Sequence, residues 1–180
     1  MKLHVSVEAR VAAEEPLGLL VACHARIRSF TALAQKLAVS KDAQPKLVTE
    51  AAADLLRYFT VAYPLHSTDE EQLLEPKLRR SPRAEVQHAL DQLEADHRAC
   101  DALLDELVPT WRTLAAPGPH APELFDGLVA PSKSLEERLL AHLKMEEDVL
   151  FPEARTLLTS AEHQALNAAI RERQNPADRA

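Results

Sequence analysis

The chain has 180 residues, 46% of them hydrophobic and 27% charged, which is the composition of a single globular domain with a sizeable core. Only three glycines stand against twelve prolines, so tight-turn residues are scarce and an all-β fold is disfavoured. A net charge of −7 without a basic face disfavours a nucleic-acid partner.

No segment of the sequence points to a membrane or to secretion. No window approaches the roughly 18 consecutive apolar residues of a membrane span, and the charged segment 1–16 lacks the apolar run of a signal peptide. The two cysteines, Cys23 and Cys100, lack the short spacing of zinc or redox motifs and are expected to be small buried side chains. We therefore expect no membrane partner and a cytoplasmic location.

Apolar residues recur at helical spacing along the first half of the chain. The first stripe follows Pro16, a favourable first helical residue, and residues 40–44 break it. Pro45 is placed to open a second helix, which continues past residue 70. Pro64 lies inside that helix and predicts a kink just before His66.

The second half repeats this organisation. Ser81 and Pro82 predict the N-cap and first turn of a third helix. The proline-rich segment 117–122 is the clearest loop and separates the third helix from a fourth. Pro131 is expected to distort the first turns of the fourth helix.

A capping box of Thr159 with Glu162 predicts a short fifth helix. Four long amphipathic helices joined by short connections favour antiparallel neighbours. The sequence thus predicts an all-α fold, an up-down-up-down four-helix bundle with its core at about residues 16–158 and a short additional C-terminal helix at about 160–173. No composition shift marks a second domain, so residues 1–180 are taken as one domain.

One phrase of eleven residues is written twice. HSTDEEQLLEP begins at His66, and HLKMEEDVLFP begins at His142 with His, two consecutive Glu, Leu and Pro at matching places. The first and third apolar stripes also carry one histidine each, His24 and His97. Within each predicted hairpin the two histidines lie at similar distances from the loop. A rise of ~1.5 Å per residue therefore predicts four inward histidines at one depth.

Two carboxylates are expected at the same level. Glu70 and Glu146 follow His66 and His142 by one helical turn on the same faces. Six buried polar groups without partners would each cost about 1–3 kcal/mol, whereas a cation would satisfy all of them. The other histidines are expected elsewhere: His88 toward solvent, His120 in the loop and His163 on the fifth helix.

Imidazole and carboxylate ligands without thiolate suit iron, manganese or zinc. Six ligands exceed the set of one tetrahedral zinc ion. They suit two octahedral ions, with two histidines for each ion and both carboxylates bridging.

With these residues the chain resembles the hemerythrin-like family, also called the HHE cation-binding domain. The family signature is His in the first helix, His-x-x-x-Glu in the second, His in the third and His-x-x-x-Glu in the fourth. Its places here are His24, His66 with Glu70, His97, and His142 with Glu146. The resemblance implies a four-helix bundle around two iron ions, a non-haem di-iron centre in which the two carboxylates and an oxo or hydroxo group bridge.

The chain departs from the oxygen-carrying members of that family. They have a fifth histidine one turn away on the third helix, where this sequence has Leu93 and Asp101. Their fourth-helix carboxylate also tends to lie five residues after the histidine, which makes Glu147 the alternative to Glu146. Further candidates for an additional ligand, an outer hydrogen-bond acceptor or a neighbour of the site are Asp101, Glu94 and Tyr63.

The resemblance implies a protein that binds or reacts with a small diatomic ligand or peroxide. Oxygen, nitric oxide and peroxide all fit, in sensing, iron handling or oxidative-stress protection. The alternatives are a di-iron enzyme, peroxidase-like or nitric oxide-reducing, and a metal-stabilised structural bundle. The rival ferritin-like class needs Glu-x-x-His on two helices, and only Glu94 with His97 has that spacing.

Overall fold

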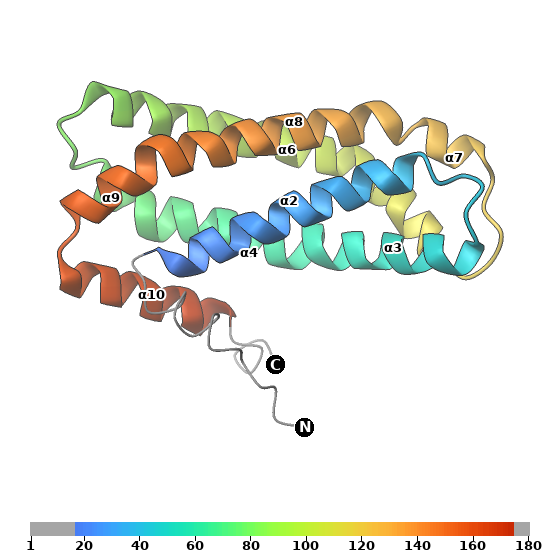
Figure 1. The fold of residues 1–180 in the computed structure, drawn as a ribbon, viewed down its shortest axis with the longest axis horizontal. Helices are drawn as coiled ribbons and strands as arrows, with labels where there is room; N and C mark the ends of the chain where they lie inside the picture. The colour runs from blue at the N-terminus through green and yellow to red at the C-terminus, as the bar shows by residue number, and fades with distance from the viewer. Residues whose placement is uncertain (1–16, 175–180) are drawn as a thin grey trace.

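The computed structural model describes residues 17–174, and within that range the chain forms helices and no strand (Figure 1). The helical segments build four long rods and a fifth, shorter helix. The first rod is α2 (Gly18–Ala38), and the third rod is α6 (Ala84–Leu114). The other two rods are composite, because short π-helical turns, labelled η, interrupt them. The second rod contains α3 (Pro45–Arg57), η1 (Tyr58–Ala62), α4 (Tyr63–Asp69), η2 (Glu70–Leu74) and α5 (Glu75–Leu78). The fourth rod contains α7 (Glu123–Asp126), α8 (Val129–Met145), η3 (Glu146–Leu150) and α9 (Phe151–Leu157), and the fifth helix is α10 (Ser160–Gln174).

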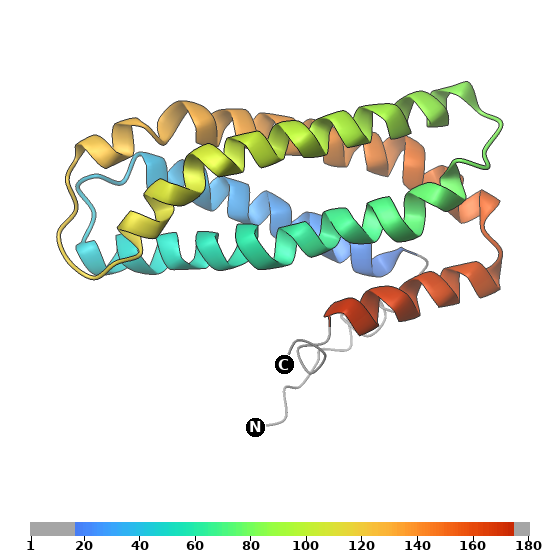
Figure 2. The ribbon, with the colours of Figure 1, turned by 180° about the vertical axis from the view of Figure 1, so that it is seen from behind.

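The rods form an up-down-up-down bundle. The first rod packs against the second and fourth, and α6 packs against the same two from the other side. Figure 2 shows α6 and the second rod side by side along the length of the bundle. The predicted all-α four-helix bundle with an additional C-terminal helix is therefore confirmed. No helix in the described range is long and apolar enough to cross a bilayer.

Three prolines account for the three π turns. Each π turn is closed by a backbone N–H that bonds to the carbonyl five residues back, and the donors are Tyr63, Glu75 and Phe151. A proline follows each donor directly, at positions 64, 76 and 152. Because a proline ring inside a helix clashes with the carbonyl four residues earlier, a wider turn relieves the contact without breaking the rod. The kink predicted at Pro64 thus takes the form of the π turn η1.

Two predicted helix starts differ from the structure. The third rod begins at Ala84 rather than next to Ser81; the Ser81 hydroxyl accepts from the Arg83 N–H at 3.2 Å and donates to Glu153 Oε1 at 2.6 Å. The fourth stripe is divided into α7 and α8, and Pro131 lies in the first turn of α8, where a missing N–H removes no intrahelical bond. The predicted start at Pro16 lies outside the described residues.

The fifth helix begins at its predicted cap. The Thr159 N–H donates to Glu162 Oε2 at 2.9 Å, and the Glu162 N–H donates to the Thr159 hydroxyl at 3.3 Å. Leu166 and Ile170 of α10 are buried against the end of the bundle. The reciprocal hydrogen bonds satisfy two backbone or side-chain groups at once and fix where the chain turns back.

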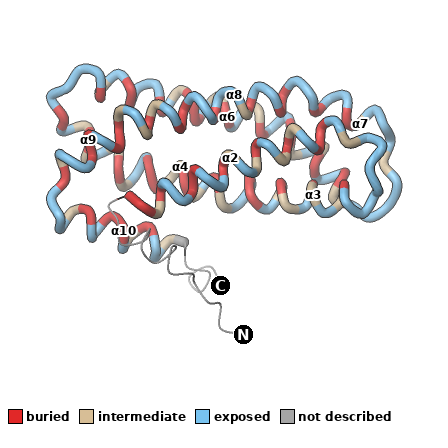
Figure 3. Tube along the Cα trace, in the orientation of Figure 1, coloured by how far each residue is buried: buried red, intermediate tan, exposed pale blue. Residues whose placement is uncertain are grey.

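Buried residues line the inner face of every rod (Figure 3). They form two hydrophobic clusters rather than one. A distal cluster, toward the 40–44 and 117–122 loops, includes Ile27, Leu55, Phe59, Tyr63, Cys100, Trp111, Leu135 and Leu139. A proximal cluster, toward α10, includes Leu20, Leu74, Leu78, Leu90, Leu93, Leu150, Phe151 and Ile170. Between the two clusters, the inner faces of the four rods carry a layer of polar side chains.

Candidate metal centre

The polar layer is built from all four rods. It contains one histidine from each rod and one glutamate from each of two π turns, and all six side chains are at most 4% exposed: His24, His66, Glu70, His97, His142 and Glu146. The structure therefore brings together every residue that the sequence analysis selected as a metal ligand.

The two glutamates lie between the histidines. Glu70 Oε1 is 3.0 Å from His66 Nε2, and Glu70 Oε2 is 3.4 Å from His97 Nε2. Glu146 Oε2 is 3.2 Å from His24 Nε2 and 3.4 Å from His142 Nε2. Each carboxylate thus contacts histidines of both helical hairpins, which is the arrangement that a bridging ligand requires.

The six groups divide into two sets that share a carboxylate. The first set contains His24 and His66 with both glutamates, and the second contains His97 and His142 with Glu70; ligand atoms within each set lie within 4.8 Å of one another. The imidazole centroids are 5.4 Å apart in the first pair and 4.9 Å apart in the second. Each set could hold a metal ion.

The orientation of these atoms is the test of whether a cation fits. Both oxygens of Glu70, both oxygens of Glu146 and the Nε2 atoms of His24, His66 and His97 are buried and make no hydrogen bond within the described chain. Many of these atoms are nevertheless within ion-pair distance of one another. Their lone pairs converge without donor geometry, which is costly for hydrogen-bonding groups and normal for metal ligands.

For most groups of the layer, burial and the neighbouring charged groups shift the pKa in opposite directions. Burial lowers the pKa of His24, but its contacts with Glu146 and Glu70 raise it to about 10. Burial likewise lowers the pKa of His97, and Glu70 raises it to about 9. Burial raises the pKa of Glu70, yet the charge of His66 and the contacts of His24 and His97 hold it well below its usual value. Burial and the charge of Glu70 raise the pKa of Glu146. Protons therefore occupy the imidazoles where a cation would compete with them.

Comparison with known proteins now decides the family. A family model described as the hemerythrin HHE cation-binding domain matches residues 15–154. The chain belongs to the hemerythrin HHE cation-binding family. An uncharacterized protein of Haemophilus influenzae is 30% identical over 107 residues, which is 54% of this chain and 62% of that protein. The alignment thus covers less than two thirds of that relative. Family membership and the His/Glu layer together support a metal-binding helical bundle.

Two outer carboxylates of this HHE layer occupy the second Glu position of the repeated phrase. Glu147 Oε1 lies 2.8 Å from His24 Nδ1, and Glu71 Oε1 lies 2.8 Å from His97 Nδ1. Glu146 faces the layer while Glu147 contacts the far side of an imidazole, so the geometry separates the two alternatives left open by the sequence. The signal for Glu71 was present, because the phrase repeats both glutamates.

The other two histidines have outer neighbours that the sequence did not mark. Asp96, which is 7% exposed, places Oδ2 3.8 Å from His142 Nδ1. The thiol of Cys23 lies beside His66 and accepts from Arg26 Nη2 at 3.0 Å. Burial raises the pKa of this thiol, but His66 and Arg26 outweigh that effect and lower it. Cys23 is buried as expected, yet it has polar contacts as well as apolar ones.

The remaining candidates are not part of the layer. Asp101 and Glu94 are exposed on α6, and neither forms an ion pair with the six groups. Tyr63 is buried beside Cys100, and its burial raises the pKa of the phenol well above the usual value, so it remains neutral. Leu93 is buried one turn before His97, which leaves no fifth histidine on that face. The histidines expected elsewhere lie outside the layer: His88 is exposed on α6, His120 is half-buried in the loop, and His163 is buried on α10.

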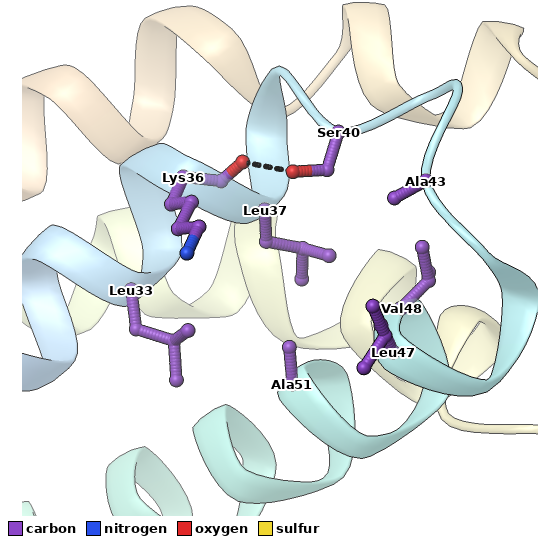
Figure 4. Close-up of a pocket in the computed structure, with 8 residues that line it drawn as sticks. All are labelled: Leu33, Lys36, Leu37, Ser40, Ala43, Leu47, Val48 and Ala51. Atoms are coloured by element: carbon purple, nitrogen blue, oxygen red, sulfur yellow. Dashed lines mark hydrogen bonds between the residues drawn. The ribbon is translucent and has the colours of Figure 1, made fainter.

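A solvent-open pocket of about 270 Å³ reaches the wall of the layer. His97 lines it together with Glu71, Glu75, Glu94, Arg98 and Asp101. A second pocket, of about 230 Å³, lies far from the layer between α2 and α3 and is lined mainly by aliphatic side chains such as Leu37 and Leu47 (Figure 4). Among its lining residues, the Ser40 hydroxyl donates a hydrogen bond to the Lys36 carbonyl. Of these two pockets, the first is lined by a histidine of the layer.

Proposed function

We propose that this HHE chain holds two iron ions in the polar layer and uses them to bind or react with a small ligand: oxygen, nitric oxide or peroxide. His24 and His66 would hold one ion and His97 and His142 the other, with Glu70 and Glu146 shared between them. The observation that carries the proposal is the convergence of seven buried nitrogen and oxygen atoms that have no hydrogen-bond partner in the described chain.

The ligand set supports iron and an open coordination position. Imidazoles and carboxylates without an inner thiolate suit iron better than softer ions. Two imidazoles and two shared carboxylates supply four ligands per ion, fewer than the six of an octahedral ion. Leu93 stands where a fifth histidine would be needed, and within residues 17–174 no further side chain joins the two ligand sets.

The surroundings of the layer support a small ligand rather than a large one. Phe151 stacks on the His24 ring at 5.1 Å, and the distal and proximal clusters close the layer from both ends. The buried side chains would keep bulk water out, and a solvent-open pocket of about 270 Å³ lies beside His97. When two ferrous ions are bound they can supply one electron each, the two electrons that reduce dioxygen or a peroxide. Chemistry that starts from ferrous iron implies a reducing compartment, and the two buried cysteines form no disulfide. Both points favour the cytoplasm.

Metal analysis with an absorption spectrum tests the proposal. We expect about two irons per chain and a visible ligand-to-metal band that changes on reduction and on addition of azide. His142→Ala and Glu70→Ala should lose iron, whereas His88→Ala, a histidine exposed on α6, should retain it. A colourless protein that binds no iron and whose stability ignores both substitutions would support a purely structural bundle. Rapid catalytic loss of hydrogen peroxide would instead favour the enzyme.

A further inference from the structure

Two carboxylates contact imidazoles of the layer from outside it, on the Nδ1 side of each ring. Glu147 Oε1 is 2.8 Å from His24 Nδ1, and Glu71 Oε1 is 2.8 Å from His97 Nδ1. An imidazole that donates its Nδ1–H to a carboxylate keeps Nε2 as an acceptor. In both histidines it is Nε2 that faces the inner glutamates. The outer carboxylates therefore select the tautomer and ring orientation that metal binding needs.

This pairing of an inner and an outer glutamate occurs twice because two π turns of the same kind occur in the chain. Glu70 and Glu71 open η2, and Glu146 and Glu147 open η3. In each pair the first side chain enters the layer and the second crosses to a histidine on a neighbouring rod. Two surface ion pairs formed by chance would not share position, partner atom and distance.

The two outer carboxylates are fixed unequally. Arg28 Nη2 donates to both oxygens of Glu147, at 3.0 and 2.8 Å. No lysine or arginine of the described residues forms an ion pair with Glu71, whose side chain is 45% exposed against 34% for Glu147. Glu71 also lines the solvent-open pocket beside His97. Glu147 is thus held between a cation and a histidine, whereas Glu71 is held by a histidine alone.

The second histidine of each pair, His66 or His142, has no outer carboxylate within hydrogen-bonding distance of Nδ1 in the described chain. His142 Nδ1 lies 3.8 Å from Asp96, beyond hydrogen-bonding distance, and the other oxygen of Asp96 accepts from Arg138 at 3.2 Å. The set of His97 and His142 therefore has one exposed outer partner and one distant one.

We propose that Glu71 and Glu147 are positioning residues of the metal centre, and that their unequal fixing makes the ion held through His97 the first to leave. The proposal rests on the two-metal function proposed above. Loss of an outer hydrogen-bond partner typically lowers metal affinity about 10–100-fold. Each outer carboxylate should therefore control the release of one ion, and Arg28 should act only through Glu147.

Ferrous iron loaded without oxygen and then captured by a coloured chelator measures the release of each ion. For the full-length wild-type chain we expect two phases of equal amplitude. Glu71→Ala should accelerate the fast phase and Glu147→Ala the slow phase, each about 10–100-fold. Glu71→Gln and Glu147→Gln should restore part of the lost retention, because an amide oxygen still accepts from Nδ1. Arg28→Met should accelerate the slow phase alone.

Matched controls carry carboxylates that do not touch a histidine. Glu75 lines the same pocket as Glu71 but pairs with Arg79 at 2.8 Å, and Asp148 follows Glu147 but pairs with Lys144. Glu75→Ala and Asp148→Ala should release iron like the wild type. If wild-type protein binds two irons but the Glu71 and Glu147 variants behave like these controls, the positioning role is refuted while the two-iron function stands. A single release phase in the wild type, or a Glu71 variant that accelerates only the slow phase, refutes the unequal fixing. A wild-type chain that binds no iron overturns the proposed function itself.

Discussion

Glu146→Leu should stabilise the metal-free protein and destabilise the metal-bound protein. Glu146 is fully buried, neither of its oxygens accepts a hydrogen bond in the described chain, and burial, together with the charge of Glu70, raises its pKa. Leucine has a similar volume and belongs naturally between the two hydrophobic clusters. After the substitution His24 keeps Glu147 at 2.8 Å, and His66 keeps Glu70 at 3.0 Å. The substitution removes the ion-pair contacts of Glu146 with His24 at 3.2 Å and His142 at 3.4 Å, and with them a buried carboxylate that accepts no hydrogen bond in the described chain.

The magnitude follows from the cost of buried charge. Replacing a buried ionic group by a well-packed apolar one is commonly neutral or stabilises by up to about 4 kcal/mol. At roughly 2–4 °C per kcal/mol for a chain of this size, the metal-free variant should melt up to about 15 °C above the metal-free wild type. With metal the order should reverse. A ligand at 1,000 times its Kd adds about 4 kcal/mol to the native state, and the variant loses a shared ligand for both ions.

Thermal denaturation of both proteins, with excess chelator and with ferrous iron under nitrogen, measures the two differences. Glu153→Leu is the matched control. Glu153 is also buried on the fourth rod, but it accepts from Ser81 at 2.6 Å and from Arg83 at 2.9 Å. Its loss should destabilise by about 1–3 kcal/mol whether or not metal is present, because satisfied partners are left unpaired. A Glu146→Leu variant that melts below the wild type in chelator would show that the layer is already satisfied without a cation.

Three further predictions concern the histidines of the layer, the cap of α10 and the distal cluster. The pKa values of His24, about 10, and His97, about 9, mean that both imidazoles are protonated at pH 7, so metal binding should release protons from both, measurable by calorimetry in buffers of different ionisation heat. Because both pKa values are raised, their contribution to the metal-free fold is complete below about pH 6.5 and is lost as pH rises through 9 to 10, whereas metal affinity increases over that range. Thr159→Ala should lower the stability of α10 by about 1 kcal/mol, because the hydrogen bonds between the Thr159 side chain and Glu162 are lost. Faster hydrogen exchange in α10 would measure this loss. Trp111→Ala, in the distal cluster, should cost about 3–5 kcal/mol in denaturant titration and leave the number of bound metal ions unchanged.

The sequence was sufficient for the bundle and for the inner layer. Helical spacing of apolar residues and short connections determine which rods are neighbours, and the histidines then fall at one depth because each hairpin has arms of similar length. Six polar groups on apolar faces cannot be accommodated without a shared partner, so their pattern is strong evidence even without coordinates. Local helix starts were less predictable. The Ser81 hydroxyl accepts from the Arg83 N–H, as an N-cap residue type suggests, but the helix starts only at Ala84. The same hydroxyl also donates to Glu153 on another rod, a contact that only the folded chain reveals.

The outer partners could not be derived from helix faces. On a regular α-helix the residue four positions after a histidine lies about 40° from it, and the residue five positions after lies about 140° away. That rule selects Glu70 and Glu146 correctly and assigns Glu71 and Glu147 to solvent. Asp96 and Cys23 carry no sequence signal at all, because their contacts with His142 and His66 cross between rods.

The prolines that end both copies of the repeated phrase explain why that rule fails for the second glutamate. Pro76 and Pro152 each stand directly after the residue that closes a π turn, and each π turn begins at the inner glutamate. A π turn takes more residues per turn than an α-helix and redirects the side chains along it. Two consecutive glutamates can then serve one centre, the first inside the layer and the second behind a histidine of the neighbouring rod. The phrase is therefore a single structural unit, in which the histidine, both glutamates and the proline are needed together. A proline that a helix-based interpretation treats only as a source of distortion is, in this fold, a determinant of the metal layer.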